Sequence, residues 1–158
     1  MAINFKAIRD NFFDGKGSMI MEPIPDIPEF AYAYTPLEEL SPLVQKLYGY
    51  YPDEARQLLA EAGYPNGFKA TITMTTEFVD LVSVIKADWA KVGVDLTIDV
   101  KESGAVSSIL RQKLHQMAIG SSASGTPPGM QRIKPGGPNN SNINDPAIMQ
   151  AKDDLSSA

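Results

Sequence analysis

His115 is the residue best suited to acid–base chemistry in this chain, because it is the only histidine. Ser122 and Ser124 follow it closely, and Asp95 or Asp99 would complete a Ser-His-Asp arrangement. The chain would then be a small serine-type hydrolase using Ser122 or Ser124 with His115. However, the sequence has no Gly-x-Ser-x-Gly turn, and closeness in sequence does not create the geometry of a triad. A capping or surface histidine is the stronger interpretation, and no catalytic residue is assigned.

The same composition restricts metal and cofactor chemistry. Without cysteine there is no disulfide, thiolate nucleophile or iron–sulfur cluster, and a single histidine excludes sites that need two. Asp95 and Asp99 share the polar face of a predicted strand, but calcium takes roughly six or more oxygen ligands and usually a tight loop. Gly136-Gly137 lacks the Gly-Lys-Ser/Thr ending of a phosphate-binding loop. The sequence therefore predicts neither a metal site nor a cofactor.

A long loop is the more informative feature. Sixteen of the 23 residues in 120–142 are Gly, Pro, Ser or Asn, and loops of this length inside a compact domain are usually functional or disordered. The loop follows a short predicted strand, and ligands of α/β proteins bind beyond the carboxyl ends of strands. Its hydroxyl and amide groups are neutral donors and acceptors. The candidate ligand-binding residues are Gly120, Ser121, Ser122, Ala123 and Ser124, with Asn139 and Asn140 as weaker candidates.

Two predicted strands and the helix between them would position that loop. Residues 68–75 and 94–101 alternate polar and apolar side chains, and residues 78–92 carry apolar side chains at helical spacing. Strand, helix and strand in this order form a βαβ unit with parallel strands. A helix from Ser103 and a short strand over 116–119 then lead into the loop. The predicted fold class is α/β with long irregular loops.

Other helices are predicted over residues 3–12 and 52–62, and a last helix begins at Asp145, where an N-cap residue is followed by proline. Three large side chains are expected to face inward: Phe12, Leu58 and Leu114. Residues 14–52 hold half of the twelve prolines and are expected to form an irregular surface traverse with a short helical piece around residues 36–48. The apolar residues interleaved there are expected to pack: Phe30, Tyr32, Tyr34, Leu37 and Leu40.

Length and charge limit the function classes. The 158 residues are expected to form one domain over 1–158. The net charge of −5, from 14 basic and 19 acidic residues, argues against nucleic acid or an anionic membrane surface as the main partner. No apolar run approaches the roughly 20 residues of a membrane span. The first residues of the chain also lack the pattern of a signal peptide.

Four segments, in order, resemble the family 5 extracellular solute-binding proteins, which are the peptide, nickel and oligosaccharide receptors of ABC importers. Residues 51–65 (Tyr-Pro-Asp-Glu-Ala-Arg-Gln-Leu-Leu-Ala-Glu-Ala-Gly-Tyr-Pro) are similar to a signature segment of that family. Residues 2–15 resemble the helix and glycine turn entering the second lobe. Residues 89–98 (Trp-Ala-Lys-Val-Gly-Val-Asp-Leu-Thr-Ile) resemble a helix-to-strand passage, and residues 140–158, with Asn144-Asp145-Pro146, resemble the loop and helix that follow.

The resemblance implies a lobe of a periplasmic-binding-protein fold. Family members hold a solute in the cleft between two lobes, so the chain is expected to be most of the second lobe of a larger two-lobed receptor. The implied function is non-catalytic solute capture for an ABC-type importer. The implied partners are a small solute, such as a peptide or an oligosaccharide, and ABC permease subunits. The implied location of the parent protein is periplasmic or extracellular, either lipid-anchored or soluble.

The sequence departs from the family at the candidate site. Peptide-binding relatives often carry a Gly-Trp-x-x-Asp pattern there, whose acid pairs with the amino terminus of the peptide. Residues 120–124 read Gly-Ser-Ser-Ala-Ser, with neither an aromatic ring nor a carboxylate. Because a buried ammonium without a partner is costly, this favours a neutral ligand rich in hydroxyl or amide groups. A protein-interaction module is the other alternative, since an isolated lobe would expose apolar surface.

Overall fold

The computed structural model describes residues 1–17, 26–119 and 144–157. Its helices and strands are, in chain order, α1 (Phe5–Phe12), α2 (Pro42–Tyr48), α3 (Pro52–Glu61), β1 (Phe68–Met74), α4 (Val79–Ala90), β2 (Val94–Val100), α5 (Ser103–Gln112), β3 (Met117–Ala118) and α6 (Pro146–Ser157). Short 3-10 helices cover Pro28–Phe30, Leu37–Glu39 and Thr76–Phe78. No helix in the described ranges is long and apolar enough to cross a membrane.

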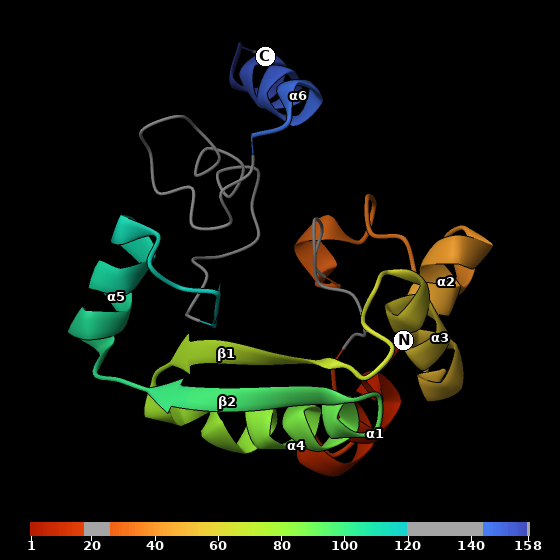
Figure 1. The fold of residues 1–158 in the computed structure, drawn as a ribbon. Helices are drawn as coiled ribbons and strands as arrows, with labels where there is room; N and C mark the ends of the chain where they lie inside the picture. Colours follow the sequence, from red (N-terminus) through yellow and green to blue (C-terminus); the bar gives the residue numbers. More distant parts are fainter. Residues whose placement is uncertain (18–25, 120–143, 158) are drawn as a thin grey trace.

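The strands of the described residues form one parallel sheet in the order β2-β1-β3. The register runs from Phe68 opposite Val94 to Met74 opposite Val100, and Thr73 lies opposite Ala118. The predicted βαβ unit and the predicted short third strand are both confirmed. The fold class is α/β, with α4 as the crossover between β1 and β2 (Figure 1).

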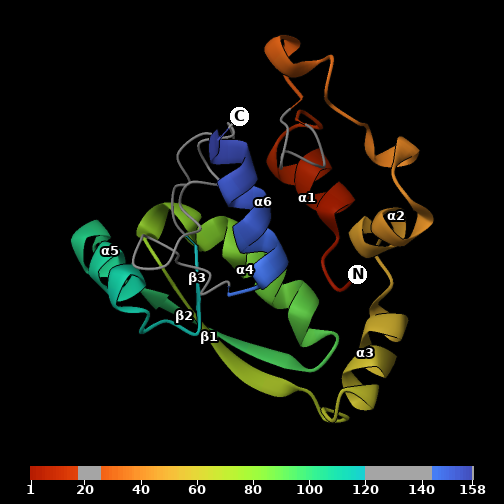
Figure 2. The same ribbon diagram turned by 90° about the horizontal axis from the view of Figure 1, so that it is seen from above.

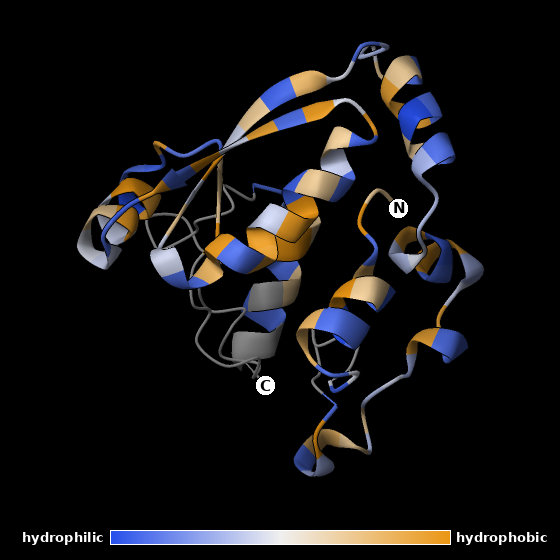
Figure 3. Ribbon diagram, turned by 90° about the horizontal axis from the view of Figure 1, so that it is seen from below, coloured by the Kyte–Doolittle hydropathy of each residue, from blue (hydrophilic) through white to orange (hydrophobic). Residues whose placement is uncertain are grey.

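The two faces of the sheet differ in polarity because the strands alternate along their length (Figure 3). One face is apolar and packs against α4. Its core consists of Ala70, Met74, Val82 and Leu96, all nearly inaccessible to solvent. On the opposite face of β2, Asp95 and Thr97 are exposed. β2 therefore has one buried and one wet face, as the alternation of polar and apolar residues over 94–101 indicates.

A second core cluster joins the sheet to the amino-terminal part of the chain. Ala55 of α3 packs with Val92 and Val94, and Met1 and Leu59 lie against them among the partly buried neighbours. Trp89 packs against both core clusters. Helix α1 contacts α4, and Figures 1 and 2 show α1 on the side of α4 away from α5.

Several boundaries differ from the predictions by a few residues. Helix α1 begins at Phe5 because the Asn4 side chain caps it, accepting a hydrogen bond from the Ala7 N–H at 2.9 Å. The α4 region begins as the 3-10 turn Thr76–Phe78. Helix α6 begins as expected, since Asp145 Oδ1 accepts from the Ala147 N–H at 2.8 Å. Within 14–52, the described residues form only short helices.

The predictions that Phe12, Leu58 and Leu114 face inward and that Tyr32 packs are wrong. Phe12, Leu58 and Leu114 are 44%, 48% and 71% exposed, and Tyr32 of the proline-rich traverse is 87% exposed. Leu114 lies outside the helix that was predicted to bury it, because α5 ends at Gln112. Phe12 and Leu58 share a different reason. α1, α3 and α5 each bury one residue, namely Ile8, Ala55 and Val106, so a single narrow contact replaces the wide stripe that the sequence suggests.

Candidate functional site

The carboxyl edge of the parallel sheet is the place where α/β proteins bind ligands, and the structure defines it closely. The hydrogen-bond ladder continues one residue beyond two of the strands. Lys101 N–H donates to the Met74 carbonyl at 2.9 Å, and Ile119 N–H donates to the Thr73 carbonyl at 3.2 Å. The three strands therefore end side by side, and the segments after Met74, Val100 and Ala118 leave the sheet from the same edge.

Asp99 organises the polar groups near this edge. Its Oδ2 accepts from the Thr73 hydroxyl at 3.3 Å, and its Oδ1 lies 2.9 Å from Lys101 Nζ. Thr73 is 5% exposed, so its hydroxyl needs this partner. The carboxylate of Asp99 is thus neutralised within the sheet. Because a cation would have to displace Lys101, the paired-carboxylate site with Asp95 has no support from this geometry.

Two helices begin at the carboxyl edge and direct unpaired backbone N–H groups toward it. The 3-10 turn Thr76–Phe78 follows β1, and α5 begins at Ser103 after the N-cap Glu102. The hydroxyl groups of Thr75, Thr76 and Ser103 lie in these segments. Glu77 and Glu102 lie in the same segments, beside the Asp99–Lys101 ion pair, so this edge is polar and carries a net negative charge.

Gly104, the second residue of α5, provides a test of how open this edge is. A Cβ at Gly104 would meet no atom within 4 Å. We expect Gly104→Ala to raise the free energy of unfolding by about 0.5 kcal/mol, because alanine loses less conformational entropy in a helix. Urea denaturation with an unchanged m value would measure the gain. A loss of stability would show instead that the space beside Gly104 is filled in solution.

All of the predicted ligand-binding residues lie outside the described residues. Gly120, Ser121, Ser122, Ala123 and Ser124 follow directly after Ile119, and Asn139 and Asn140 belong to the same undescribed segment, 120–143. The described structure fixes only where this segment begins. It begins at the carboxyl edge of β3, next to Thr73.

The hydrolase alternative gains no support from the described residues. His115 is half-buried and lies between α5 and β3, before the strand begins, whereas Ser122 and Ser124 come after the strand and are not described. His115 lies two residues after Lys113, which closes α5 with a positive φ of 58°.

The described residues also contain no group of three or more His, Asp and Glu side chains that could hold a metal ion.

A second polar centre, which the sequence did not predict, lies at the end of α4, where it contacts the amino-terminal segment. Asp88 is only 6% exposed and sits in the last turn of α4. Its Oδ2 accepts from the backbone N–H of Asn4 at 2.9 Å, and its Oδ1 lies 2.7 Å from Lys91 Nζ. The carboxylate therefore ties the amino-terminal segment to α4.

Lys91 extends this centre to the segment before α3. Its Nζ lies 3.2 Å from the Tyr50 hydroxyl and 5.6 Å from the centre of the Tyr50 ring. Asp88, and secondarily Tyr50, raise the pKa of Lys91 above its ordinary value of 10.5. The contribution of this interaction to stability is therefore complete at neutral pH and is lost only as the pH rises through the raised pKa.

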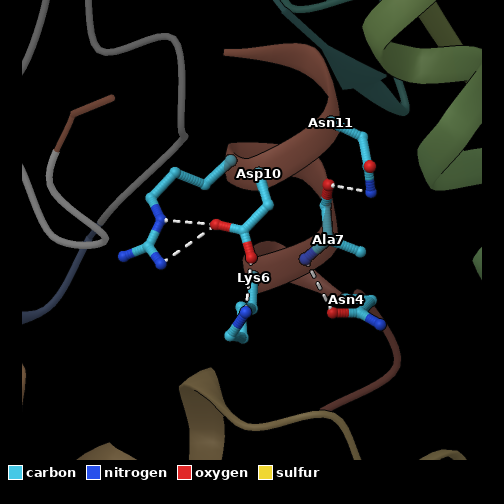
Figure 4. Close-up of polar contacts among 6 residues, drawn as sticks. Asn4, Lys6, Ala7, Asp10 and Asn11 are labelled. Atoms are coloured by element: carbon cyan, nitrogen blue, oxygen red, sulfur yellow. Dashed lines mark hydrogen bonds and ion pairs between the residues drawn. The ribbon is translucent and has the colours of Figure 1, made fainter. Parts of the chain in front are cut away.

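Asn4 has two roles at this centre, one through its backbone and one through its side chain. The backbone N–H binds Asp88, while the side chain caps α1 (Figure 4). Farther along α1, Lys6 and Arg9 both contact the Asp10 carboxylate. Hydrogen bonds from Lys6 and then Arg9 lower the pKa of Asp10 below its ordinary value. The hydrogen bond from the Asn4 backbone N–H to Asp88 thus fixes the start of the chain against α4.

A shallow, mostly apolar depression of about 510 Å³ lies beside this anchor, lined by Met1, Ala2, Ile3, Phe5, Leu47, Tyr48 and Trp89. The Met1 amino group donates to the Leu47 carbonyl at 2.8 Å, and Tyr51 N–H donates to the Met1 carbonyl at 2.9 Å. Burial lowers the pKa of that amino group.

The sequence contained one signal for the polar centre at Asp88. An aspartate in the last turn of a helix opposes the helix dipole and needs a compensating partner.

Solved structures of larger binding proteins contain the same fold. HbpA2 from Haemophilus parasuis matches 99% of this chain with a TM-score of 0.72 and 27% identity, and the match covers 31% of that protein. DppA from Helicobacter pylori, in complex with the peptide STSA, matches 96% of this chain with a TM-score of 0.69 and 28% identity, covering 30% of DppA. The described fold is therefore that of one part of a periplasmic binding protein.

The chain belongs to the bacterial extracellular solute-binding proteins of family 5, because the model of that family's middle region matches residues 1–142. The resemblance found in the sequence is confirmed. A stretch of 100 residues, 59% of the chain, is also 34% identical to heme-binding protein A of Haemophilus influenzae and covers 16% of that protein. The chain thus spans less than a third of the length of these relatives.

Proposed function

We propose that this chain is part of a receptor that captures a solute for an ABC-type importer and releases it chemically unchanged. The observation that carries this proposal is the match of the solute-binding family over residues 1–142. A non-catalytic role is consistent with the similar proteins, whose names describe binding. The parent protein would be periplasmic or extracellular, lipid-anchored or soluble, and would deliver its solute to ABC permease subunits.

In this proposal, residues 1–158 form one domain, most of the second lobe, and the solute lies between it and a first lobe. The similar solved structures support this division, because the chain matches about 30% of each. The solute would contact residues 120–124, with Asn139 and Asn140 from the same segment. The position of Ile119 at the carboxyl edge supports that assignment, since the segment leaves the sheet where parallel sheets bind ligands.

The relatives suggest which ligands to try. One is named for heme, and another was solved with the peptide STSA. The lack of a carboxylate in residues 120–124 favours a ligand with no free ammonium at this position. The informative comparison is therefore between STSA and its N-acetylated form, which differ in that one charge. A neutral oligosaccharide, heme and Ni²⁺ complete a small panel.

An amide-resolved NMR titration of the 158-residue chain tests the proposal. We expect N-acetyl-STSA or the oligosaccharide to shift the amides of Ile119 and residues 120–124 with weak affinity, because one lobe supplies only part of the contacts of a closed cleft. Free STSA should shift them less. Amides of α3, which is distant from the edge, serve as the internal control.

Two results would contradict the proposal. Shifts located around α3 or around His115, rather than at the carboxyl edge, would move the site elsewhere. Tight one-to-one binding by the chain alone would mean that no second lobe is needed. A stronger response to free STSA than to its acetylated form would overturn the ligand class but would leave solute capture intact.

The protein-interaction alternative rests on exposed apolar side chains. Tyr32, Leu43 and Leu114 are 87%, 67% and 71% exposed. These residues belong to three separate segments, and single exposed apolar residues are normal on protein surfaces. Solute capture therefore remains the function that the observations support best.

A further inference from the structure

β3 is the shortest strand in the described part of the chain, and it determines where the chain leaves the sheet. It consists of Met117 and Ala118, and Met117 lies opposite Ile72 of β1. At its end, the Ile119 N–H donates to the Thr73 carbonyl at 3.2 Å. A strand of this length makes few ladder hydrogen bonds and has low local stability. Its place beside β1 therefore depends on what holds its two ends.

The beginning of β3 lies beside Thr71, whose backbone N–H faces it. Residues 71 and 73 of β1 both direct their backbone groups toward β3, because these directions alternate along a strand. In a longer parallel ladder, the Thr71 N–H would bond to the backbone carbonyl of residue 115. β3 begins only at Met117, after the connection 113–116 from α5. Thr71 is partly buried, so its N–H needs another partner.

The Gln116 side chain provides this partner. Its Oε1 accepts a hydrogen bond from the Thr71 N–H at 2.8 Å. The side-chain amide therefore takes the place of a backbone carbonyl and extends the ladder by one hydrogen bond. β3 is thus held at its beginning by the side chain of Gln116 and at its end by the backbone of Ile119.

Burial does not explain the glutamine at this position. Met117 and Ile119 pack against the core cluster on the apolar face of the sheet, whereas Gln116 is exposed. The hydrogen bond to Thr71 joins residues that are 45 positions apart in the chain. This bond is therefore the contact that an alanine at position 116 would lack.

We infer that Gln116 is a positioning residue of the proposed solute site, because its side chain anchors the beginning of β3 to β1 and thereby holds Ile119 at the carboxyl edge. The consequence for the solute rests on the proposed function, in which residues 120–124, directly after Ile119, contact the solute. The anchoring itself rests only on the described contacts. A receptor binds more weakly when the residues that support its contact segment must be ordered on binding.

Amide hydrogen exchange of three variants tests the anchoring. Gln116→Ala removes the acceptor, Gln116→Glu keeps an oxygen at the same reach, and Gln112→Ala is the matched control. Gln112 is also an exposed glutamine, but its amide binds Ser108 within α5. We expect the Ile119 amide to exchange about fivefold faster in Gln116→Ala, as the loss of one exposed hydrogen bond predicts. The Lys101 amide, which bonds to β1 from the β2 side, should keep its rate.

The glutamate variant separates anchoring from a general loss of stability. Gln116→Glu should restore the exchange rate of Ile119, because a carboxylate oxygen also accepts from the Thr71 N–H. A general loss of stability would accelerate Lys101 as well. The inference is overturned if Gln116→Ala leaves the Ile119 rate unchanged, if Gln112→Ala accelerates it equally, or if Gln116→Glu does not restore it.

A titration with N-acetyl-STSA, followed by the Ile119 amide shift, tests the consequence for the solute. The apparent affinity should fall about twofold in Gln116→Ala, because β3 is held at the edge in a smaller fraction of molecules. It should stay unchanged in Gln112→Ala. Faster exchange of Ile119 with an unchanged affinity would overturn the positioning role. If the unchanged chain responds to no ligand of the panel, the role at a solute site falls with the proposed function, while the exchange experiment still decides the anchoring.

Discussion

Replacing Gly67 by alanine is expected to lower the free energy of unfolding by about 3–4 kcal/mol, through backbone strain and overpacking together. Gly67 has a φ of +74°, and a Cβ built on it would lie 1.8 Å from the carbonyl oxygen of Gly93. Gly67 immediately precedes β1, and Gly93 immediately precedes β2. The obstacle is backbone that cannot turn aside, so the two strands would have to separate at their first pair, Phe68 and Val94.

Gly63→Ala is the matched control for that experiment. Gly63 has a φ of +92° with no atom within 4 Å of a Cβ, so alanine there meets only the conformational strain. We expect a loss of about 1–2 kcal/mol. Urea denaturation of both variants compares the two losses. Equal losses would show that the close approach of Gly67 to Gly93 contributes nothing to the cost.

The centre of the fold, from β1 to β2, was predictable from the sequence. The chain from Phe68 to Val100 carries short-range signals that agree with one another: alternation over both strands, helical spacing between them, and Gly93 at the turn. Each signal is read within a few residues. The parallel pairing follows from the length of the helical connection. Consistent local signals of this kind need no knowledge of distant contacts.

The peripheral helices were less predictable because burial depends on what lies opposite. Leu58 and Leu114 occupy positions where an apolar stripe predicts burial, yet both are largely exposed. Helix α3 contacts the second core cluster chiefly through Ala55. Spacing along a helix shows which residues share a face, but it does not show how wide the opposing surface is.

The candidate site illustrates a different limit. The type of residue in 120–124 could be read from the sequence, and the place where that segment begins follows from the register of β3. The polar centre at Asp88 could not be derived in the same way, because its partner Asn4 lies 84 residues away in the chain. An unusual position for an acid indicates that a partner exists but does not identify it.

Asp88→Ala is expected to lower the free energy of unfolding by about 2 kcal/mol, because the Asn4 N–H would lose a charged acceptor in a buried position. The loss should act first on the amino-terminal segment and α1, which contact α4 near this point. Hydrogen exchange of the Asn4 amide should therefore accelerate by more than that of amides in β1. Denaturant titration measures the global loss, and exchange locates it.

Two further variants separate the hydrogen bond from the ion pair at Asp88. Asp88→Asn keeps an oxygen that can accept from the Asn4 N–H, so it should lose less stability than Asp88→Ala. Lys91→Met removes only the cation, and the Lys91 side chain is 57% exposed, so its loss should be the smallest of the three. If Lys91→Met destabilised the chain as much as Asp88→Ala, the ion pair rather than the bond to Asn4 would hold the amino-terminal segment. Accelerated exchange of the Asn4 amide in Asp88→Ala, but not in Lys91→Met, would establish the carboxylate as the anchor.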